Sequence, residues 1–471
     1  MKTRIVLLFS LLVCLTCACS KGISGRVSCD GKGLEGVVVS DGYDCVLTDA
    51  RGRYTLERKR GVRFISVSTP AGYLPETADK TIPLDYQKVM EGCTHYDFNL
   101  VKNPLDDSHH VFIVQADAQM NDSSQFTLYQ KILDDINGYV KPLRGKVDLL
   151  GFDCGDITWD RPNIFDGYIS TVACLDMPIY RAIGNHDMTH GGRSFESSYS
   201  KFEEEFGPIY HSFNRGKAHY VILDNCFFID RDYLFIGYLD ERTLSWLEKD
   251  LSFVPEDNPV FIFMHIPASF TKEIAFNKLN MDELANCRGF FELLKGHKTH
   301  LITGHTHFNH NVCYSDSLME HNTAAACGLW WMNELCTDGT PQGYGVYDVN
   351  GTDVSWTYKC AGFPSDYQFR ISPVGSDPEY PKDLIVNVWN YDEKWKVEWS
   401  EAGGPFMPMT QFTGNDMTIK KVIYSGLKDK IGWLDATRTV HLFRAAPTKG
   451  GPVVIRVTDR FGNVYQETYG L

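Results

Sequence analysis

The chain has 471 residues, which is long enough for two or three domains. Its 60 Asp and Glu residues outnumber its 46 Lys and Arg residues, giving a formal net charge of −14 at pH 7. This balance argues against non-specific nucleic-acid binding, because such binding needs Lys and Arg to displace the counterions of the phosphates.

The N-terminus has the pattern of an export signal. Lys2 and Arg4 precede an apolar stretch at residues 5–15, which is too short to cross a bilayer comfortably. Ala18 directly before Cys19 resembles the processing site of a bacterial lipoprotein. We therefore expect residues 1–19 to act as a lipoprotein-type signal peptide, with a lipid on Cys19 that anchors the protein to a membrane in the periplasm. Cleavage by an ordinary signal peptidase, giving a secreted soluble protein, is the alternative.

Cysteines are frequent, with 14 in the chain and 11 of them after Cys19. None of these 11 cysteines forms a Cys-x-x-Cys pair with another, so a zinc ribbon or a thioredoxin-like motif is not indicated. In an exported protein Cys29 and Cys45 could form a disulfide. For most of the others we expect small buried hydrophobic side chains.

Residues 22–100 have the pattern of a small all-β domain. Residues 23–27 and 36–39 are apolar or β-branched, and the turn signal Asp30-Gly31 separates them. The stretch 48–56 resembles a hairpin of a transthyretin-like or carboxypeptidase-regulatory β-sandwich. No catalytic cluster is found in this part of the sequence.

Residues 101–350 alternate apolar strand-like runs with helical patterns, which indicates α/β layering. Apolar residues recur at i, i+4 spacing through residues 123–140, and a serine could cap the start of that helix. Similar patterns predict helices at residues 240–251 and 281–294.

Residues 351–471 return to β character and predict a second β-sandwich. Residues 384–389 and 394–399 have the pattern of two strands paired around a turn. Residues 453–457 and 463–468 predict another pair.

One feature recurs in the middle domain: an apolar strand ends, and Asp, Asn or His follows at once. Strands buried on both faces have continuous apolar runs, and α/β sheets bind ligands beyond the carboxyl ends of their strands. These side chains should therefore converge, and their oxygen and nitrogen atoms suit Mn, Fe, Zn or Mg. They are Asp117, Gln119, Asp156, Asn185, His186, Asp187, His265, His305 and His307.

Each motif alone is weak evidence, but five such strand ends in order resemble the calcineurin-like metallophosphoesterase family. The flanking β-modules resemble those of one bacterial branch of that family. The fold that this resemblance implies is an α/β protein with a four-layered αββα sandwich, in which two sheets lie between helices and the metals bind at their joint edge. Two small all-β sandwich domains would flank it.

The resemblance also implies a role for each residue. Asp156 would bridge two divalent metal ions; Asp117 and His307, with Gln119 nearby, would hold the first, and Asn185, His265 and His305 the second. The implied reaction is attack on a phosphate ester by a hydroxide bridging the metals, with His186 as the general acid and Asp187 orienting it.

Two positions depart from the pattern of relatives. Many members have Asp-x-His where this chain has Asp117-Ala118-Gln119, and an amide binds transition metals less well than imidazole. This leaves the identity of the first metal open. Trp159 lies where purple acid phosphatases have a tyrosine ligand, so a coloured tyrosinate–iron site is not expected.

Four residues are candidates for contact with substrate. Trp330 and Trp331 could stack on a sugar or a base, or they could be core residues. His190 and Arg193 could reach a phosphate, or they could be ordinary surface loop residues.

The sequence therefore predicts hydrolysis of a mono- or diester of a small molecule such as a sugar phosphate, a nucleotide or a lipid headgroup. The expected partners are that substrate and, through the lipid anchor only, a membrane; no nucleic acid is expected, and the oligomeric state stays open. A protein phosphatase is an alternative, although its acid motif usually ends in Glu where this chain has Asp187. The other alternative is a non-catalytic lipoprotein that binds glycans or partner proteins.

Overall fold

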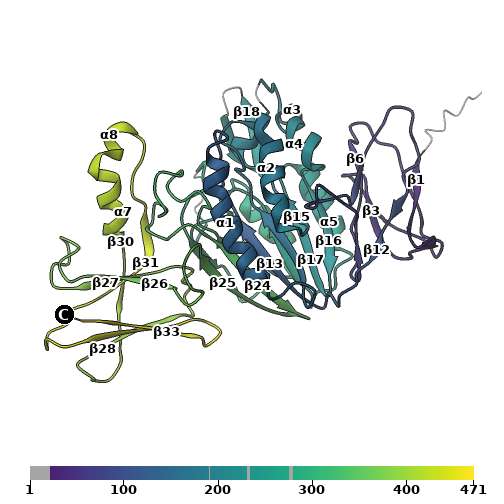
Figure 1. Ribbon diagram of the computed structural model, residues 1–471. Helices are drawn as coiled ribbons and strands as arrows, with labels where there is room; N and C mark the ends of the chain where they lie inside the picture. Colours follow the sequence, from purple (N-terminus) through teal and green to yellow (C-terminus); the bar gives the residue numbers. More distant parts are fainter. Residues whose placement is uncertain (1–21, 190, 231–233, 275–278, 471) are drawn as a thin grey trace, which may run out of the picture.

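The computed structural model describes residues 22–189, 191–230, 234–274 and 279–470, so Cys19 and His190 lie outside the described residues. Three units follow one another in space as they do in sequence (Figure 1). The N-terminal β-domain lies at one end, the α/β domain in the middle and the C-terminal β-domain at the other end.

The first sheet of the middle domain has five strands in the order β15-β14-β13-β24-β25. The adjacent strands β13, β14 and β15 run parallel, so their carboxyl ends meet at one edge of the sheet. The strands are β13 (His109–Gln115), β14 (Asp148–Asp153), β15 (Ile179–Arg181), β24 (Gly343–Asn350) and β25 (Asp353–Cys360).

The second sheet has six strands in the order β16-β17-β20-β21-β23-β22, and β17, β20, β21 and β23 run parallel. The strands are β16 (His211–Arg215), β17 (Ala218–Ile222), β20 (Pro259–Phe263), β21 (Lys298–Thr303), β22 (His310–Cys313) and β23 (Leu318–Asn322). A separate hairpin, β18 (Cys226–Asp230) and β19 (Leu234–Gly237), follows β17.

Aromatic side chains fill the space between the two sheets. Phe152 of β14 stacks on Phe263 of β20 with ring centroids 3.6 Å apart, and Phe112 of β13 meets Phe261 edge to face at 5.1 Å. These rings are almost completely buried. Such pairs add to the hydrophobic stabilisation that their burial provides, so the two sheets are held face to face.

Helices cover the outer faces, which confirms the four-layered sandwich. α1 (Gln125–Val140) and α2 (Phe165–Val172) pack on the first sheet, and α5 (Glu241–Leu251) and α6 (Cys287–Leu293) pack on the second. The short helices α3 (Phe195–Ser198) and α4 (Ser200–Phe206) join the layer of α1 and α2. The helix predicted at residues 281–294 is shorter than expected, because α6 begins only at Cys287.

The first sheet also extends past the expected domain boundary at residue 350. β24 and β25 form a hairpin paired from Gly343 with Cys360 to Asn350 with Asp353. Gly351 takes a φ of +64° in the turn between them. The α/β domain therefore continues to Cys360, and the boundary at 350 would divide this hairpin.

The N-terminal domain has two four-stranded sheets, β11-β1-β2 with β5 and β10-β6-β3-β4, which enclose one core, and two further strand pairs, β7 with β12 and β8 with β9. The stretch predicted as a hairpin at 48–56 is not one, because β4 pairs with β3 whereas β5 pairs with β1 in the other sheet. Its strands are β1 (Ile23–Cys29), β2 (Lys32–Gly33), β3 (Val38–Ser40), β4 (Cys45–Leu47), β5 (Arg53–Leu56), β6 (Phe64–Val67), β7 (Tyr73–Leu74), β8 (Thr77–Ala78), β9 (Ile82–Pro83), β10 (Tyr86–Lys88), β11 (Phe98–Asn99) and β12 (Val101–Lys102).

The C-terminal domain has two four-stranded sheets, β26-β27-β31-β30 and β29-β28-β32-β33. The predicted pair at 453–457 and 463–468 is confirmed as β32 and β33. The predicted pairing of 384–389 with 394–399 is wrong, because β27 and β28 lie in different sheets. The strands are β26 (Phe369–Ser372), β27 (Leu384–Val388), β28 (Lys396–Glu401), β29 (Met407–Pro408), β30 (Thr410–Asn415), β31 (Arg438–Ala445), β32 (Val453–Thr458) and β33 (Val464–Tyr469).

A helical segment interrupts this domain between β30 and β31. It contains α7 (Met417–Val422), a π-type turn (Ile423–Leu427) and α8 (Lys428–Lys430). In Figure 1 the segment stands beside the α/β domain. Its apolar residues Ile419, Ile423 and Leu434 pack on Leu329 of the α/β domain.

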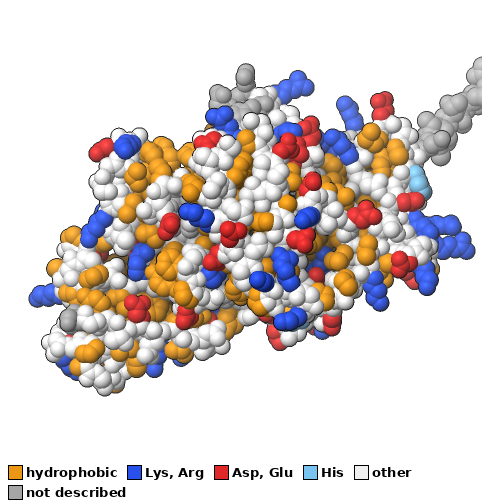
Figure 2. Space-filling model, viewed as in Figure 1, with side chains coloured by type: hydrophobic (Ala, Val, Ile, Leu, Met, Phe, Trp, Pro, Cys, Tyr) orange, Lys and Arg blue, Asp and Glu red, His pale blue; other side chains and the backbone are white. Residues whose placement is uncertain are grey.

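All 11 cysteines of the described part are free, including Cys29 and Cys45, so the disulfide considered for that pair is not formed. No helix of the described chain combines the length and the apolar character needed to span a bilayer. Charged side chains of both signs are scattered over the face seen in Figure 2, between groups of hydrophobic side chains.

The aromatic stack between the sheets gives a stability prediction. Phe152→Ala removes a ring that is 1% exposed and should lower the free energy of unfolding of the α/β domain by about 3–5 kcal/mol. Phe253→Ala, at a side chain 38% exposed, is the matched control and should change it by less than about 1 kcal/mol. Denaturant titration followed by circular dichroism measures both; equal shifts would contradict the assignment of Phe152 to the core.

Candidate metal centre

The predicted ligands converge where the carboxyl ends of the parallel strands of both sheets meet. Asp117, Asp156 and Asn185 follow β13, β14 and β15 of the first sheet. His265 follows β20, and His305 and His307 follow β21, of the second sheet. The pattern that the sequence analysis singled out therefore marks one place in space.

His265 lies at the centre of one half of the cluster. Its Nδ1 donates to the carbonyl oxygen of Cys154 at 2.7 Å, so Nε2 is the ring nitrogen that a cation would use. Burial opposes the charged ring, but the charge of Asp156 outweighs it and raises the pKa of His265 to about 9, so a bound cation would take the place of the proton on Nε2. Around Nε2 lie Asn185 Oδ1 at 3.1 Å, His305 Nδ1 at 3.1 Å and Asp156 Oδ2 at 3.2 Å. The ligand atoms of Asp156, His265 and His305 all lie within 4.8 Å of one another. Several lone pairs directed at one point suit a cation.

The other half contains two buried polar atoms without a partner among the described residues. Gln119 donates from Nε2 to Asp156 Oδ2 at 2.9 Å, and its Oε1 is left unpaired. His307 Nε2 is also unpaired and lies 3.7 Å from Asp117 Oδ1. Leaving such atoms unpaired in the interior is costly, and a coordinated metal ion would satisfy them. The donor set therefore fits a second cation next to the first.

Burial and the neighbouring charges together shift the pKa values of these ligands. Burial raises the pKa of Asp117 well above its usual value. It lowers the pKa of His307 to about 3, so this ring is neutral at neutral pH and its lone pair is available to a metal. For Asp156, burial acts in the same direction as for Asp117, but the charges of His265 and His186 outweigh it and the pKa is lowered.

The backbone of the site is held in an unusual conformation. Asp117, Gln119, Asp156, His305 and His307 have φ values of +56°, +36°, +52°, +75° and +56°. Residues with a Cβ rarely adopt this left-handed region, and they do so mainly where the surrounding structure enforces it at functional sites. The strained turns direct the five side chains inward.

Gly184 shows how closely the turns approach one another. A Cβ at this position would lie 2.1 Å from Asp156 Oδ1, although the φ of Gly184 is an ordinary −99°. Glycine is therefore needed here for the close approach of two chain segments rather than for a left-handed turn.

His186 borders the cluster and is paired with a carboxylate that the sequence analysis did not identify. Its Nδ1 lies 2.7 Å from Asp160 Oδ1, and its backbone N–H donates to Asp156 Oδ1 at 2.9 Å. Burial opposes the charged ring, but the charge of Asp156 and the hydrogen bond with Asp160 outweigh it and raise the pKa of His186. The one sequence signal for Asp160 was its position four residues after Asp156 of the Gly155-Asp156 motif.

The expectation that Asp187 orients His186 is wrong. The Asp187 carboxylate accepts hydrogen bonds from the backbone N–H groups of Ile157 at 3.1 Å, Thr158 at 2.9 Å and Gly184 at 3.0 Å. It therefore joins the loop after β14 to the loop after β15. Burial raises the pKa of this carboxyl to about 7.

A cavity of about 250 Å³ opens at the cluster. Trp330 borders it, whereas Trp331 packs into the core and donates from Nε1 to the carbonyl oxygen of Ala118 at 2.8 Å. Arg193 is exposed and does not border the cavity. The residues around the cavity are Gln119, Asp156, Trp159, His186, His305, His307, Trp330 and Trp433.

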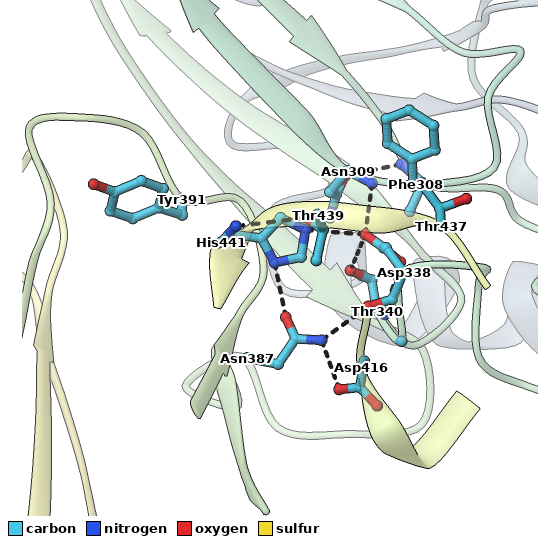
Figure 3. A network of polar contacts seen from close by, with 12 residues as sticks. Phe308, Asn309, Asp338, Thr340, Asn387, Tyr391, Asp416, Thr437, Thr439 and His441 are labelled. Atoms are coloured by element: carbon cyan, nitrogen blue, oxygen red, sulfur yellow. Dashed lines mark hydrogen bonds and ion pairs between the residues drawn. The ribbon is translucent and has the colours of Figure 1, made fainter. Parts of the chain in front are cut away.

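A buried polar network attaches the C-terminal domain to the loop that carries His307 (Figure 3). Asp338 Oδ2 accepts from the backbone N–H of Asn309 at 3.0 Å and lies 3.1 Å from His441 Nε2. Asn387 lies 2.7 Å from the other ring nitrogen and donates to Asp416, which caps α7, at 2.8 Å. The network thus links α7 with the metal loop.

The chain is similar to several solved structures. One is a dimetal phosphatase from Danio rerio, with 13% identity and a TM-score of 0.37 over 54% of this chain and 96% of that one. Another is a purple acid phosphatase from yellow lupin (Lupinus luteus), with 11% identity and a TM-score of 0.40 over 66% and 59%. A 5′-nucleotidase from Candida albicans has 14% identity and a TM-score of 0.36 over 56% and 54%. No curated protein matches the chain.

Models of three protein families match in succession along the chain. The N terminal of calcineurin-like phosphoesterase matches residues 21–103, calcineurin-like phosphoesterase matches residues 92–309, and the C terminal of calcineurin-like phosphoesterase matches residues 320–465. The second match contains every predicted metal ligand. The chain therefore belongs to the calcineurin-like phosphoesterase family, in a form with both N- and C-terminal extension domains.

Proposed function

We propose that the protein hydrolyses a phosphate ester of a small molecule with the help of two divalent metal ions. Its family supports metal-dependent phosphoester hydrolysis. The observation that carries the proposal is the convergence of ligand atoms from both sheets on one cavity, beside a histidine that can act as an acid.

Two groups of residues would hold the metals, with the Asp156 carboxylate shared between them. When bound, the two cations would supply a nucleophilic water and neutralise charge on the phosphoryl oxygens. One group is Asp117, Gln119, Asp156 and His307, and the other is Asp156, Asn185, His265 and His305.

His186 would donate the proton to the leaving oxygen. The hydrogen bond with Asp160 engages Nδ1 and the ring borders the cavity, so Nε2 is the nitrogen that would face the ester. Asp160 favours the protonated ring by its charge. Asp187 would act at a distance, by holding together the two loops that carry Asp156 and His186.

The alternative of a non-catalytic glycan- or partner-binding lipoprotein is less well supported. A core that had lost catalysis should also have lost ligands, yet every expected ligand borders or directly contacts the cluster. A small-molecule ester is favoured over a phosphoprotein because tryptophans wall the 250 Å³ cavity.

The first test is metal dependence. Asp156→Ala should abolish retention of both metals and lower kcat/KM on p-nitrophenyl phosphate or bis-p-nitrophenyl phosphate by roughly a thousandfold or more, because the shared carboxylate is lost. Elemental analysis and assays after metal stripping and re-addition of Mn, Fe, Zn or Mg measure this, with the exposed Asp257→Ala as the control. A folded wild-type protein that retains no metal and hydrolyses neither ester would refute the proposal.

The second test separates Asp160 from Asp187. A general acid matters most when the leaving group is a poor one, so His186→Ala should lower kcat on an alkyl phosphate by about 10²–10⁴-fold but affect p-nitrophenyl phosphate much less. Asp160→Asn should show the same leaving-group dependence at about 10–100-fold, the effect of losing a hydrogen bond to a charged group.

Asp187→Asn is the matched comparison for Asp160→Asn. It should lower thermal stability and affect both esters alike, because its partners are backbone N–H groups of the loops. If Asp187→Asn rather than Asp160→Asn shows the leaving-group dependence, the assignment of Asp160 is wrong.

We also propose that the protein is exported and anchored in the periplasm by a lipid on Cys19, with cleavage to a secreted soluble form as the alternative. The support is the charged and apolar pattern of residues 2–18. Cys19→Ser should move the protein from the membrane fraction to the soluble fraction of the expressing bacterium, as detected by immunoblotting. Mass spectrometry of the wild-type N-terminus should find acylated Cys19, and an unmodified N-terminus would contradict the proposal.

A further inference from the structure

Trp433 brings a residue of the C-terminal domain to the metal cavity, where it completes an aromatic wall with Trp159 and Trp330. The ring centroids of Trp330 and Trp433 are 4.9 Å apart and the planes are steeply inclined at 83°. Trp159 lies 6.2 Å from Trp433 and 6.3 Å from Trp330. The rings are too close to enclose a ligand between them, so they form one continuous surface. We call these three residues the tryptophan wall.

The wall runs from the proposed acid to a metal ligand. Trp159 lies 6.0 Å from the ring of His186, and Trp330 stacks on His307 at 4.1 Å. The leaving oxygen of an ester must lie next to the acid. The group attached to that oxygen therefore meets Trp159 and Trp433.

The backbone is arranged to present this wall. Trp330 and Trp331 have consecutive left-handed φ values of +48° and +63°, which cost free energy for residues with a Cβ. Trp331 is held by its bond to Ala118, and it fixes the turn from which Trp330 reaches the cavity.

Trp433 is 58% exposed although tryptophan is a large apolar side chain. The segment that carries it is tied at both ends. Asp416 of the polar network caps α7 at one end, and the Thr437 backbone N–H donates to the carbonyl oxygen of Thr337 at 2.9 Å at the other. Trp433 is therefore held at the mouth of the cavity with much of its surface open to a ligand.

The tryptophan wall offers no positively charged side chain to a second anionic group of the substrate, because none of the described residues around the cavity is Lys or Arg. A flat aromatic surface next to a phosphate site suits the face of a ring. We propose, on the basis of the proposed function, that the tryptophan wall is the leaving-group subsite and selects phosphate esters whose alcohol carries a ring, namely a nucleoside or a sugar, over acyclic esters.

The test compares ring and acyclic esters on the full metal-loaded protein. Kinetic constants are measured for adenosine 5′-monophosphate, glucose 6-phosphate, glycerol phosphate and phosphocholine. Wild-type kcat/KM should be highest for adenosine 5′-monophosphate or for glucose 6-phosphate. Which of these two is preferred distinguishes a nucleoside subsite from a sugar subsite. Trp433→Ala should lower that value by about 5–150-fold, the range for loss of one stacking contact, and change the value for glycerol phosphate by less than about twofold.

Two further variants separate binding from structure. Trp433→Phe should recover part of the loss, and Phe253→Ala, at an exposed aromatic that does not border the cavity, should have no effect. An equal loss on all esters, or a wild-type preference for glycerol phosphate or phosphocholine, would overturn the proposal.

Calorimetry with the same four compounds gives a readout that does not depend on turnover. Ring compounds should bind more tightly than acyclic ones, and Trp433→Ala should remove the difference. If p-nitrophenyl phosphate and all four esters resist hydrolysis but the binding difference is found, the proposed function fails and the ring subsite stands. If esters are hydrolysed without any ring preference in rate or binding, the subsite fails alone.

Discussion

The stacking of Phe152 on Phe263 between the two sheets is the contact on which the metal centre depends. Phe152 lies two residues before Cys154 and Phe263 two residues before His265, so the stack brings the ends of β14 and β20 together. The hydrogen bond from His265 to the Cys154 carbonyl then fixes the ring that faces Asp156. Each half of the centre takes ligands from both sheets, so the packing of the hydrophobic core sets the distance between those ligands.

The sequence was sufficient to predict the fold and the clustering of the candidate ligands, because both depend on local patterns. Continuous apolar runs identify buried parallel strands, and a polar residue after such a run marks the binding edge. Asp117, Asp156 and His265 could be found in this way. The pairing errors in the β-domains have the opposite cause, since strands close in sequence can lie in different sheets, as β27 and β28 do.

The site residues that were not predicted, and the wrongly predicted contact of Asp187 with His186, depend on contacts that no local pattern records. Asp187 is next to His186 in the chain, but the short helical turn Asn185–Asp187 directs the two side chains apart, and Asp160 reaches His186 from another loop. Trp433 is more than 100 residues from Trp330 in sequence, and only the attachment of the C-terminal domain brings it to the cavity.

The attachment of the helical segment between β30 and β31 has a consequence for how such proteins diversify. The proposed metal ligands follow the ends of core strands, where left-handed backbone turns and tight glycine contacts leave little room for substitution. Trp433 lies instead on a surface turn that follows α8. If the tryptophan wall acts as proposed, substitutions or small insertions in this one turn would alter which esters are accepted and leave the proposed metal ligands unchanged.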